Sequence, residues 1–114
     1  MEKFFLSDKI NDVTIIRMAF TEISLVQREE LKKEMEKLLK GDNKKFIIDL
    51  TKVGFISSLV LATLVFFAKE VREREGAVKL TGVSTEAYSI FQLTQLDKVF
   101  EIFETEQEAL ETLK

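Results

Sequence analysis

The sequence predicts an α/β fold with a four- to five-stranded, mostly parallel sheet, opened by an antiparallel hairpin and packed against four helices. Short apolar runs alternate with segments of helical periodicity in the order β-β-α-β-α-β-α-β-α. Such alternation is typical of right-handed crossovers between parallel strands. The chain has 114 residues, no proline and no low-complexity tract, so no linker divides it. We therefore expect one domain over residues 1–114.

The first elements are a hairpin and an amphipathic helix. Apolar runs at residues 3–6 and 13–20 lie on either side of Asn11-Asp12, a pair that favours a turn, so we expect two antiparallel strands. Ser24, with a glutamine three residues later, forms a capping box that opens a helix. Gly41 is expected to end this helix in the left-handed conformation.

The remaining elements alternate between strand and helix, and each predicted helix begins at a serine or threonine. The second helix is apolar nearly all round in its first three turns, which predicts deep burial against the sheet. The predicted elements are a strand at 45–50, a helix at 58–75 ended by Gly76, a strand at 77–81, a short helix capped by Ser84, a strand at 99–103 and a helix opened by a capping box at Thr105.

Composition excludes several classes of function. There is no cysteine and no histidine, so thiolate metal sites and the usual general bases are missing, and the net charge of −3 argues against a nucleic-acid partner. No phosphate-binding glycine loop or paired catalytic carboxylates are present, and the longest apolar stretch, 53–68, is too short to span a bilayer. We expect a cytoplasmic protein that is not an enzyme, has no cofactor or metal, and contacts no membrane. The bias toward Glu and Lys resembles that of proteins from hot environments.

Two places carry candidate functional residues. Asp49 ends a buried strand, where it either hydrogen-bonds the following turn or supports a site at this edge of the sheet. Ser57 and Ser58 stand where a loop enters the second helix, and one of them is expected to cap it. A helix N-terminus also stabilises negative charge, so a phosphoserine here would be tolerated by the fold while adding nearly two charges to an apolar surface.

The segment from Phe46 to Ser58, Phe-Ile-Ile-Asp-Leu-Thr-Lys-Val-Gly-Phe-Ile-Ser-Ser, resembles the STAS domain of anti-sigma factor antagonists. In that family a strand ending in Asp-Leu leads to an apolar pair, then Asp-Ser-Ser-Gly and a leucine-rich helix. Residues 76–83 resemble the next strand of the family, 93–100 its leucine-rich link, and 108–110 the start of its last helix. The resemblance covers essentially the whole chain and implies a STAS-like fold.

The resemblance implies a regulatory switch. In the family, the unphosphorylated domain binds an anti-sigma factor that is also a serine kinase with an ATPase fold, and so frees a sigma factor. Phosphorylation of the first serine of the motif breaks this complex, and a serine phosphatase resets it. That phosphoacceptor serine corresponds to Ser58.

The motif departs from the family pattern at three positions: Ser57 replaces the aspartate, Leu59 the second serine and Val60 the glycine. A Gly-x-Leu-Asp pattern after the second strand is replaced by Ala-Phe-Thr-Glu at 19–22. By this resemblance, the residues expected to contact the partner are Phe55, Ile56, Ser57, Leu59, Val60, Thr21 and Glu22.

Two alternatives remain open at the level of sequence. One is a STAS scaffold or self-associating signalling module that works without phosphorylation, which the apolar pair Leu59-Val60 favours. The other is a carrier of a small ligand such as a nucleotide or lipid, for which the sequence shows no recognition groups.

Overall fold

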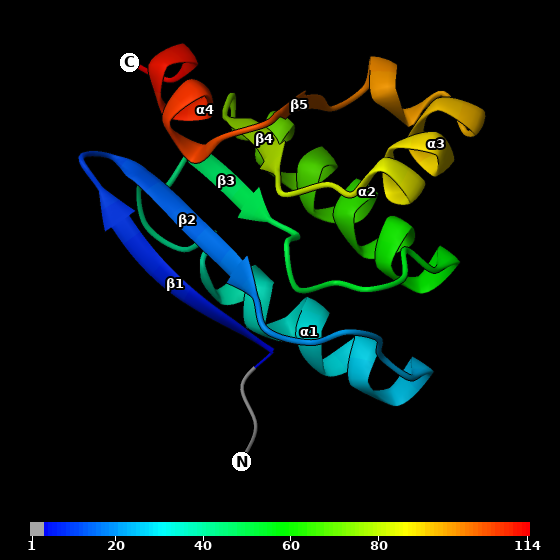
Figure 1. Ribbon diagram of the computed structural model, residues 1–114. Helices are drawn as coiled ribbons and strands as arrows, with labels where there is room; N and C mark the ends of the chain where they lie inside the picture. Colours follow the sequence, from blue (N-terminus) through cyan, green and yellow to red (C-terminus); the bar gives the residue numbers. More distant parts are fainter. Residues whose placement is uncertain (1–3) are drawn as a thin grey trace.

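The computed structural model describes residues 4–114. The chain folds into a five-stranded mixed sheet with helices on both faces (Figure 1). The strands lie in the order β1-β2-β3-β4-β5; β1 and β2 are antiparallel, and every later neighbour pair is parallel. This confirms the predicted fold class. The strands are β1 (Phe5–Ile10), β2 (Val13–Met18), β3 (Lys45–Asp49), β4 (Ala77–Thr81) and β5 (Glu101–Phe103). The helices are α1 (Leu25–Lys37), α2 (Ser58–Glu73), α3 (Thr85–Leu93), the 3-10 helix η1 (Leu96–Lys98) and α4 (Glu106–Thr112).

The hairpin forms around the predicted turn, but its first strand is longer than the apolar run suggested. Ile10 lies opposite Val13, and Asn11 between them adopts the left-handed conformation with φ 56°. The strand expected at 3–6 continues through polar residues to Ile10, because it is the exposed edge of the sheet and needs no apolar face on its outer half. Residue 3 lies outside the described residues.

Strand β3 is buried between two layers of helices. Phe46 and Ile48 pack into the larger core cluster, together with the buried faces of α1, α2 and α3. Ile47 points to the opposite face, where it packs with Ala109 and Leu113 at the C-terminal end of the chain. All three strand residues have an exposed fraction of 0%, so the two faces of β3 hold the two layers together.

Two helices end differently from the prediction. Helix α1 ends at Lys37, and i to i+3 hydrogen bonds from Leu39 and Lys40 tighten its last turn before Gly41, which has φ 81°. Helix α2 ends at Glu73, two residues before the predicted end at 75, and Glu75 adopts the left-handed conformation with φ 63°. Within residues 4–114, no helix is both long and apolar enough to cross a bilayer.

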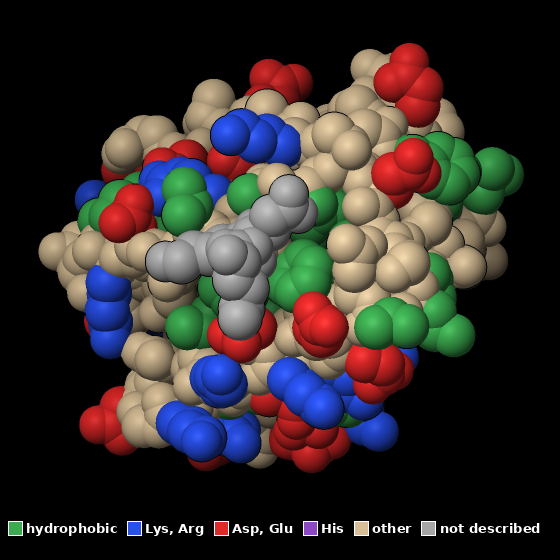
Figure 2. All heavy atoms as spheres, turned by 90° about the horizontal axis from the view of Figure 1, so that it is seen from below, with side chains coloured by type: hydrophobic (Ala, Val, Ile, Leu, Met, Phe, Trp, Pro, Cys, Tyr) green, Lys and Arg blue, Asp and Glu red, His purple; other side chains and the backbone are tan. Residues whose placement is uncertain are grey.

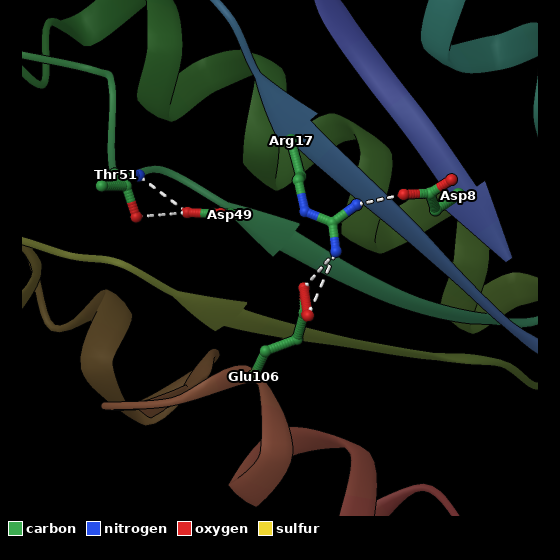
Figure 3. Close-up of polar contacts among 5 residues, drawn as sticks. All are labelled: Asp8, Arg17, Asp49, Thr51 and Glu106. Atoms are coloured by element: carbon green, nitrogen blue, oxygen red, sulfur yellow. Dashed lines mark hydrogen bonds and ion pairs between the residues drawn. The ribbon is translucent and has the colours of Figure 1, made fainter. Parts of the chain in front are cut away.

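An arginine on β2 joins the edge hairpin to α4 (Figure 3). Arg17 Nη1 lies 2.6 Å from Asp8 Oδ2 on β1, and Arg17 Nη2 donates to both carboxylate oxygens of Glu106, at 2.8 and 3.1 Å. Partial burial by itself lowers the pKa of Arg17, but attraction to Glu106 and Asp8 outweighs it and raises the pKa above its ordinary value. The guanidinium therefore stays charged and bridges three elements.

Gly76 is required by close packing. A Cβ at this position would overlap the backbone oxygen of Lys44 and lie 2.7 Å from Val71 Cγ1. We expect Gly76→Ala to lower the free energy of unfolding by about 2 to 3 kcal/mol, because the backbone must shift to make room. Urea denaturation measures this. Gly54→Ala is the matched control, since its Cβ would meet no atom closer than 3.9 Å; equal losses in the two variants would contradict the packing argument.

Candidate functional site

Helices α1 and α2 run side by side in the same direction, so both begin at the same end of the molecule (Figure 1). Arg28 Nε donates to Thr63 Oγ1 at 3.2 Å, and one turn further along both helices Lys32 Nζ lies 4.1 Å from the centre of the Phe66 ring. This arrangement follows from the sheet, because the two helices leave the carboxyl ends of the adjacent strands β2 and β3, which are parallel.

The two loops that precede these helices touch. The backbone N–H of Gly54, in the β3–α2 loop, donates to the carbonyl oxygen of Thr21, in the β2–α1 loop, at 3.2 Å. Thr21 and its neighbour Glu22 are exposed. Two segments that lie about thirty residues apart in the sequence, and that the family resemblance singled out separately, therefore form one surface.

Ser57 and Ser58 have different roles in the structure. Ser57 is the N-cap of α2, with extended backbone (φ −87°, ψ 168°), and its Oγ accepts a hydrogen bond from the N–H of Val60 at 3.3 Å. Ser58 is the first residue of the helix and is exposed. Within residues 4–114, its hydroxyl makes no hydrogen bond. One of the two serines thus caps the helix, as predicted, and the other is exposed.

Exposed apolar side chains lie at the start of α1 and in the loop before α2. Phe55 is 62% exposed, and Leu25 and Val26, the first two residues of α1, are 63% and 70% exposed. Figure 2 shows hydrophobic side chains on the right of the lower face, the side on which α1 begins in Figure 1. Sequence reasoning missed Leu25 and Val26, although their position outside the buried stripe of Leu31 and Met35 could have revealed them.

Two of the residues expected to contact a partner are not at the surface. Ile56 is only 6% exposed and Val60 only 1%, and both pack in the larger core cluster. They support the loop and the first turn of α2 from beneath, so fewer of the expected contact residues are exposed than the sequence suggested. Phe55, Thr21 and Glu22 are exposed, while Ser57 and Leu59 are partly exposed.

Asp49 belongs to the turn after β3 and not to this surface. Its Oδ1 accepts hydrogen bonds from the N–H of Thr51 at 2.9 Å and from the Thr51 hydroxyl at 2.5 Å (Figure 3). The carboxylate lies on the α4 side of the sheet, beside Arg17 in the strand register, whereas α2 covers the other side. Gly82, with φ 70°, allows this turn to approach β4, because a Cβ there would overlap Thr51. Asp49 therefore stabilises the turn, as the simpler of the two sequence interpretations predicted.

Comparison with known proteins identifies the family to which the chain belongs. A family model described as the STAS domain matches residues 6–109. A protein from Thermotoga maritima, described as a candidate anti-sigma factor antagonist, is 31% identical over 108 residues, which make up 93% of this chain and 95% of that protein. The chain therefore belongs to the STAS domain family.

Solved structures show the same fold. The crystal structure of a candidate anti-sigma factor antagonist from Thermotoga maritima has a TM-score of 0.86 with 26% identity, and the match covers 95% of this chain and 92% of that one. The Bacillus cell fate determinant SpoIIAA in its phosphorylated form has a TM-score of 0.74 with 19% identity, over 96% of this chain and 99% of that one. The latter likeness is one of fold alone.

The different roles of the two serines can be tested by alanine substitution. We expect Ser57→Ala to lower the free energy of unfolding by about 1 kcal/mol, because the N–H of Val60 loses its capping partner. Ser58→Ala is the control and should change the free energy of unfolding by less than about 0.5 kcal/mol, as is usual for an exposed side chain away from such features. Thermal or urea unfolding measures both values. A larger loss for Ser58→Ala than for Ser57→Ala would show that the roles are reversed.

Proposed function

We propose that this chain is a regulatory protein-binding module that acts as an anti-sigma factor antagonist and is switched by phosphorylation of Ser58. Its partner would be an anti-sigma factor that is also a serine kinase with an ATPase fold, and a serine phosphatase would restore the unmodified form. The observation that carries the proposal is the exposed hydroxyl of Ser58, which the helix cap leaves free, at the edge of an exposed apolar surface.

The position of Ser58 suits a charge switch. It lies in the first turn of a sixteen-residue helix, where the helix dipole and free backbone N–H groups stabilise negative charge. A phosphate there adds nearly two negative charges without disturbing the cap, which is made by Ser57. Modification would therefore change the binding surface and leave the fold intact.

The same phosphate would oppose binding to an apolar partner. The exposed residues next to Ser58 on the same stripe of α2 are Ala62 and Val65, one and two turns further on, and Phe55 stands in the loop before it. A partner that covers these side chains would have to desolvate the phosphate, which is costly unless that partner supplies a cation. Release of the partner on phosphorylation follows from this cost.

A module that works without phosphorylation is the second candidate. It is favoured by the exposed apolar residues Leu25, Val26 and Phe55, which can bind a partner or a second copy whatever the state of Ser58. The two functions differ in one respect: only the switch requires a modified Ser58.

Mapping of phosphate by mass spectrometry tests the switch. The tryptic peptide from Val53 to Lys69 contains both serines. In protein recovered from its native host, we expect phosphate on Ser58, because its hydroxyl is exposed, and its level should differ between resting and stressed growth. Ser57 should stay unmodified, since its Oγ is held in the cap. A peptide without phosphate under every condition would favour the second candidate.

A charge substitution tests the consequence for binding. We expect Ser58→Asp to weaken binding to the host's anti-sigma kinase by about tenfold or more, because the added carboxylate opposes burial of the apolar contact. The melting temperature should stay nearly unchanged, since a helix N-terminus tolerates negative charge. Isothermal titration calorimetry with each purified serine-kinase anti-sigma factor of the host measures the affinity.

The matched control for this substitution is Ser57→Asp. It adds the same charge one residue away, and aspartate can replace serine as an N-cap. Equal binding by Ser58→Asp and the unmodified protein would exclude the switch. Equal weakening by both aspartate variants would point to a general effect of charge and not to a specific role of Ser58.

A further inference from the structure

The last strand of the sheet has an open edge. Strand β5 pairs with β4 through Glu101, Ile102 and Phe103, and no other strand of residues 4–114 pairs with its other side. Within residues 4–114, these three residues make no backbone hydrogen bond apart from that ladder. In a parallel pair, alternate residues direct their N–H and C=O groups away from the partner strand, so part of the β5 backbone is available for a further strand.

Two surface hollows lie against β5. The larger, of about 470 Å³, lies at the carboxyl ends of β4 and β5, and the smaller, of about 230 Å³, lies along β5; they share Tyr88, Ile102 and Phe103 in their walls and so adjoin each other. We call the two hollows together the β5 groove; its lining is residues 82–85, 88, 97 and 100–104. Figure 1 shows β5 passing between α3 and α4. Ile102 packs toward the α3 side of the sheet and Phe103 toward the α4 side, so apolar surface lies on both sides of the strand.

The β5 groove carries negative charge. Asp97, Glu101 and Glu104 are its charged lining residues, and none of the lining residues is Lys or Arg. Lys79 forms an ion pair with Glu101, which leaves Asp97 and Glu104 without a cation among the described residues. A ligand with phosphate or carboxylate groups would be repelled here, whereas a cationic ligand would be attracted.

We propose that the β5 groove binds an extended, positively charged segment of a partner protein as an added sixth strand. Three features support this occupant together: unpaired backbone at the edge of β5, apolar and aromatic walls that can accept alternate side chains, and two free carboxylates on the rim. Addition of a strand to a sheet edge uses these elements, with main-chain hydrogen bonds giving affinity and side-chain pockets giving specificity.

This surface is separate from the one that contains Ser58. Strand β4 lies between β5 and β3, and the Ser58 surface is built from the loops after β2 and β3. Binding at the β5 groove is therefore independent of the proposed phosphorylation switch, and failure of either proposal leaves the other standing.

A synthetic peptide tests the inference. The probe is the capped hexapeptide Lys-Val-Lys-Ile-Arg-Val, and its counterpart Glu-Val-Glu-Ile-Glu-Val has the same apolar residues with opposite charge. In a two-dimensional NMR titration of the full chain, we expect the basic peptide to shift the amides of 82–85 and 101–104. The amides of 55–62 should not move, and added salt should weaken the binding, because part of it is electrostatic.

Charge-neutralising variants complete the test. The double variant Asp97→Asn, Glu104→Gln should weaken binding of the basic peptide by about tenfold and reduce its salt dependence. The control Glu30→Gln, Glu36→Gln removes two exposed carboxylates from α1 and should bind as the unmodified protein does, as should Ser58→Asp. Circular dichroism confirms that each variant is folded.

Three results would overturn the inference: no shift at 101–104 with millimolar basic peptide, equal binding of the acidic peptide, or shifts that centre on 55–62. The last of these would assign the cationic segment to the Ser58 surface.

Discussion

Burial of β3 on both faces is the constraint on which the rest of this structure depends. Phe46 and Ile48 bring α1 and α2 onto one face, and Ile47 brings α4 onto the other, and none of these side chains has exposed surface. Because β3 is parallel to β2, the chain leaves both strands at the same edge of the sheet. The loop after β3 therefore lies beside the loop after β2, and the two helices that follow are parallel neighbours.

The candidate site is a consequence of that arrangement. The two loops form one surface, joined by the hydrogen bond from the N–H of Gly54 to the carbonyl oxygen of Thr21. The hydroxyl of Ser58 lies at this surface and is not used for capping, because the preceding residue, Ser57, is the N-cap of α2. The core residues Ile56 and Val60 hold the loop and the helix start from beneath. The core thus supports the candidate site from beneath, and Ser58 is exposed on its surface.

The elements that could be predicted from the sequence are those with local signals. Capping boxes at Ser24 and Thr105 mark the starts of α1 and α4 and are formed in the structure. The length of β1 could not be predicted, because pairing with β2 and not its own polar composition makes it a strand. Burial of Ile56 and Val60 likewise depends on how the loop lies over the core, which no local pattern encodes. The β5 groove depends on contacts among three segments and has no sequence signal at all.

One aromatic ring gives this chain an optical property that follows from its fold. Tyr88 is its single tyrosine, and there is no tryptophan, so almost all of its near-ultraviolet emission arises from one side chain. That side chain is 39% exposed and forms part of the wall of the β5 groove, on the far side of β4 from the Ser58 surface. The intrinsic fluorescence of the unlabelled protein therefore monitors one end of the sheet and is nearly blind to events at the other.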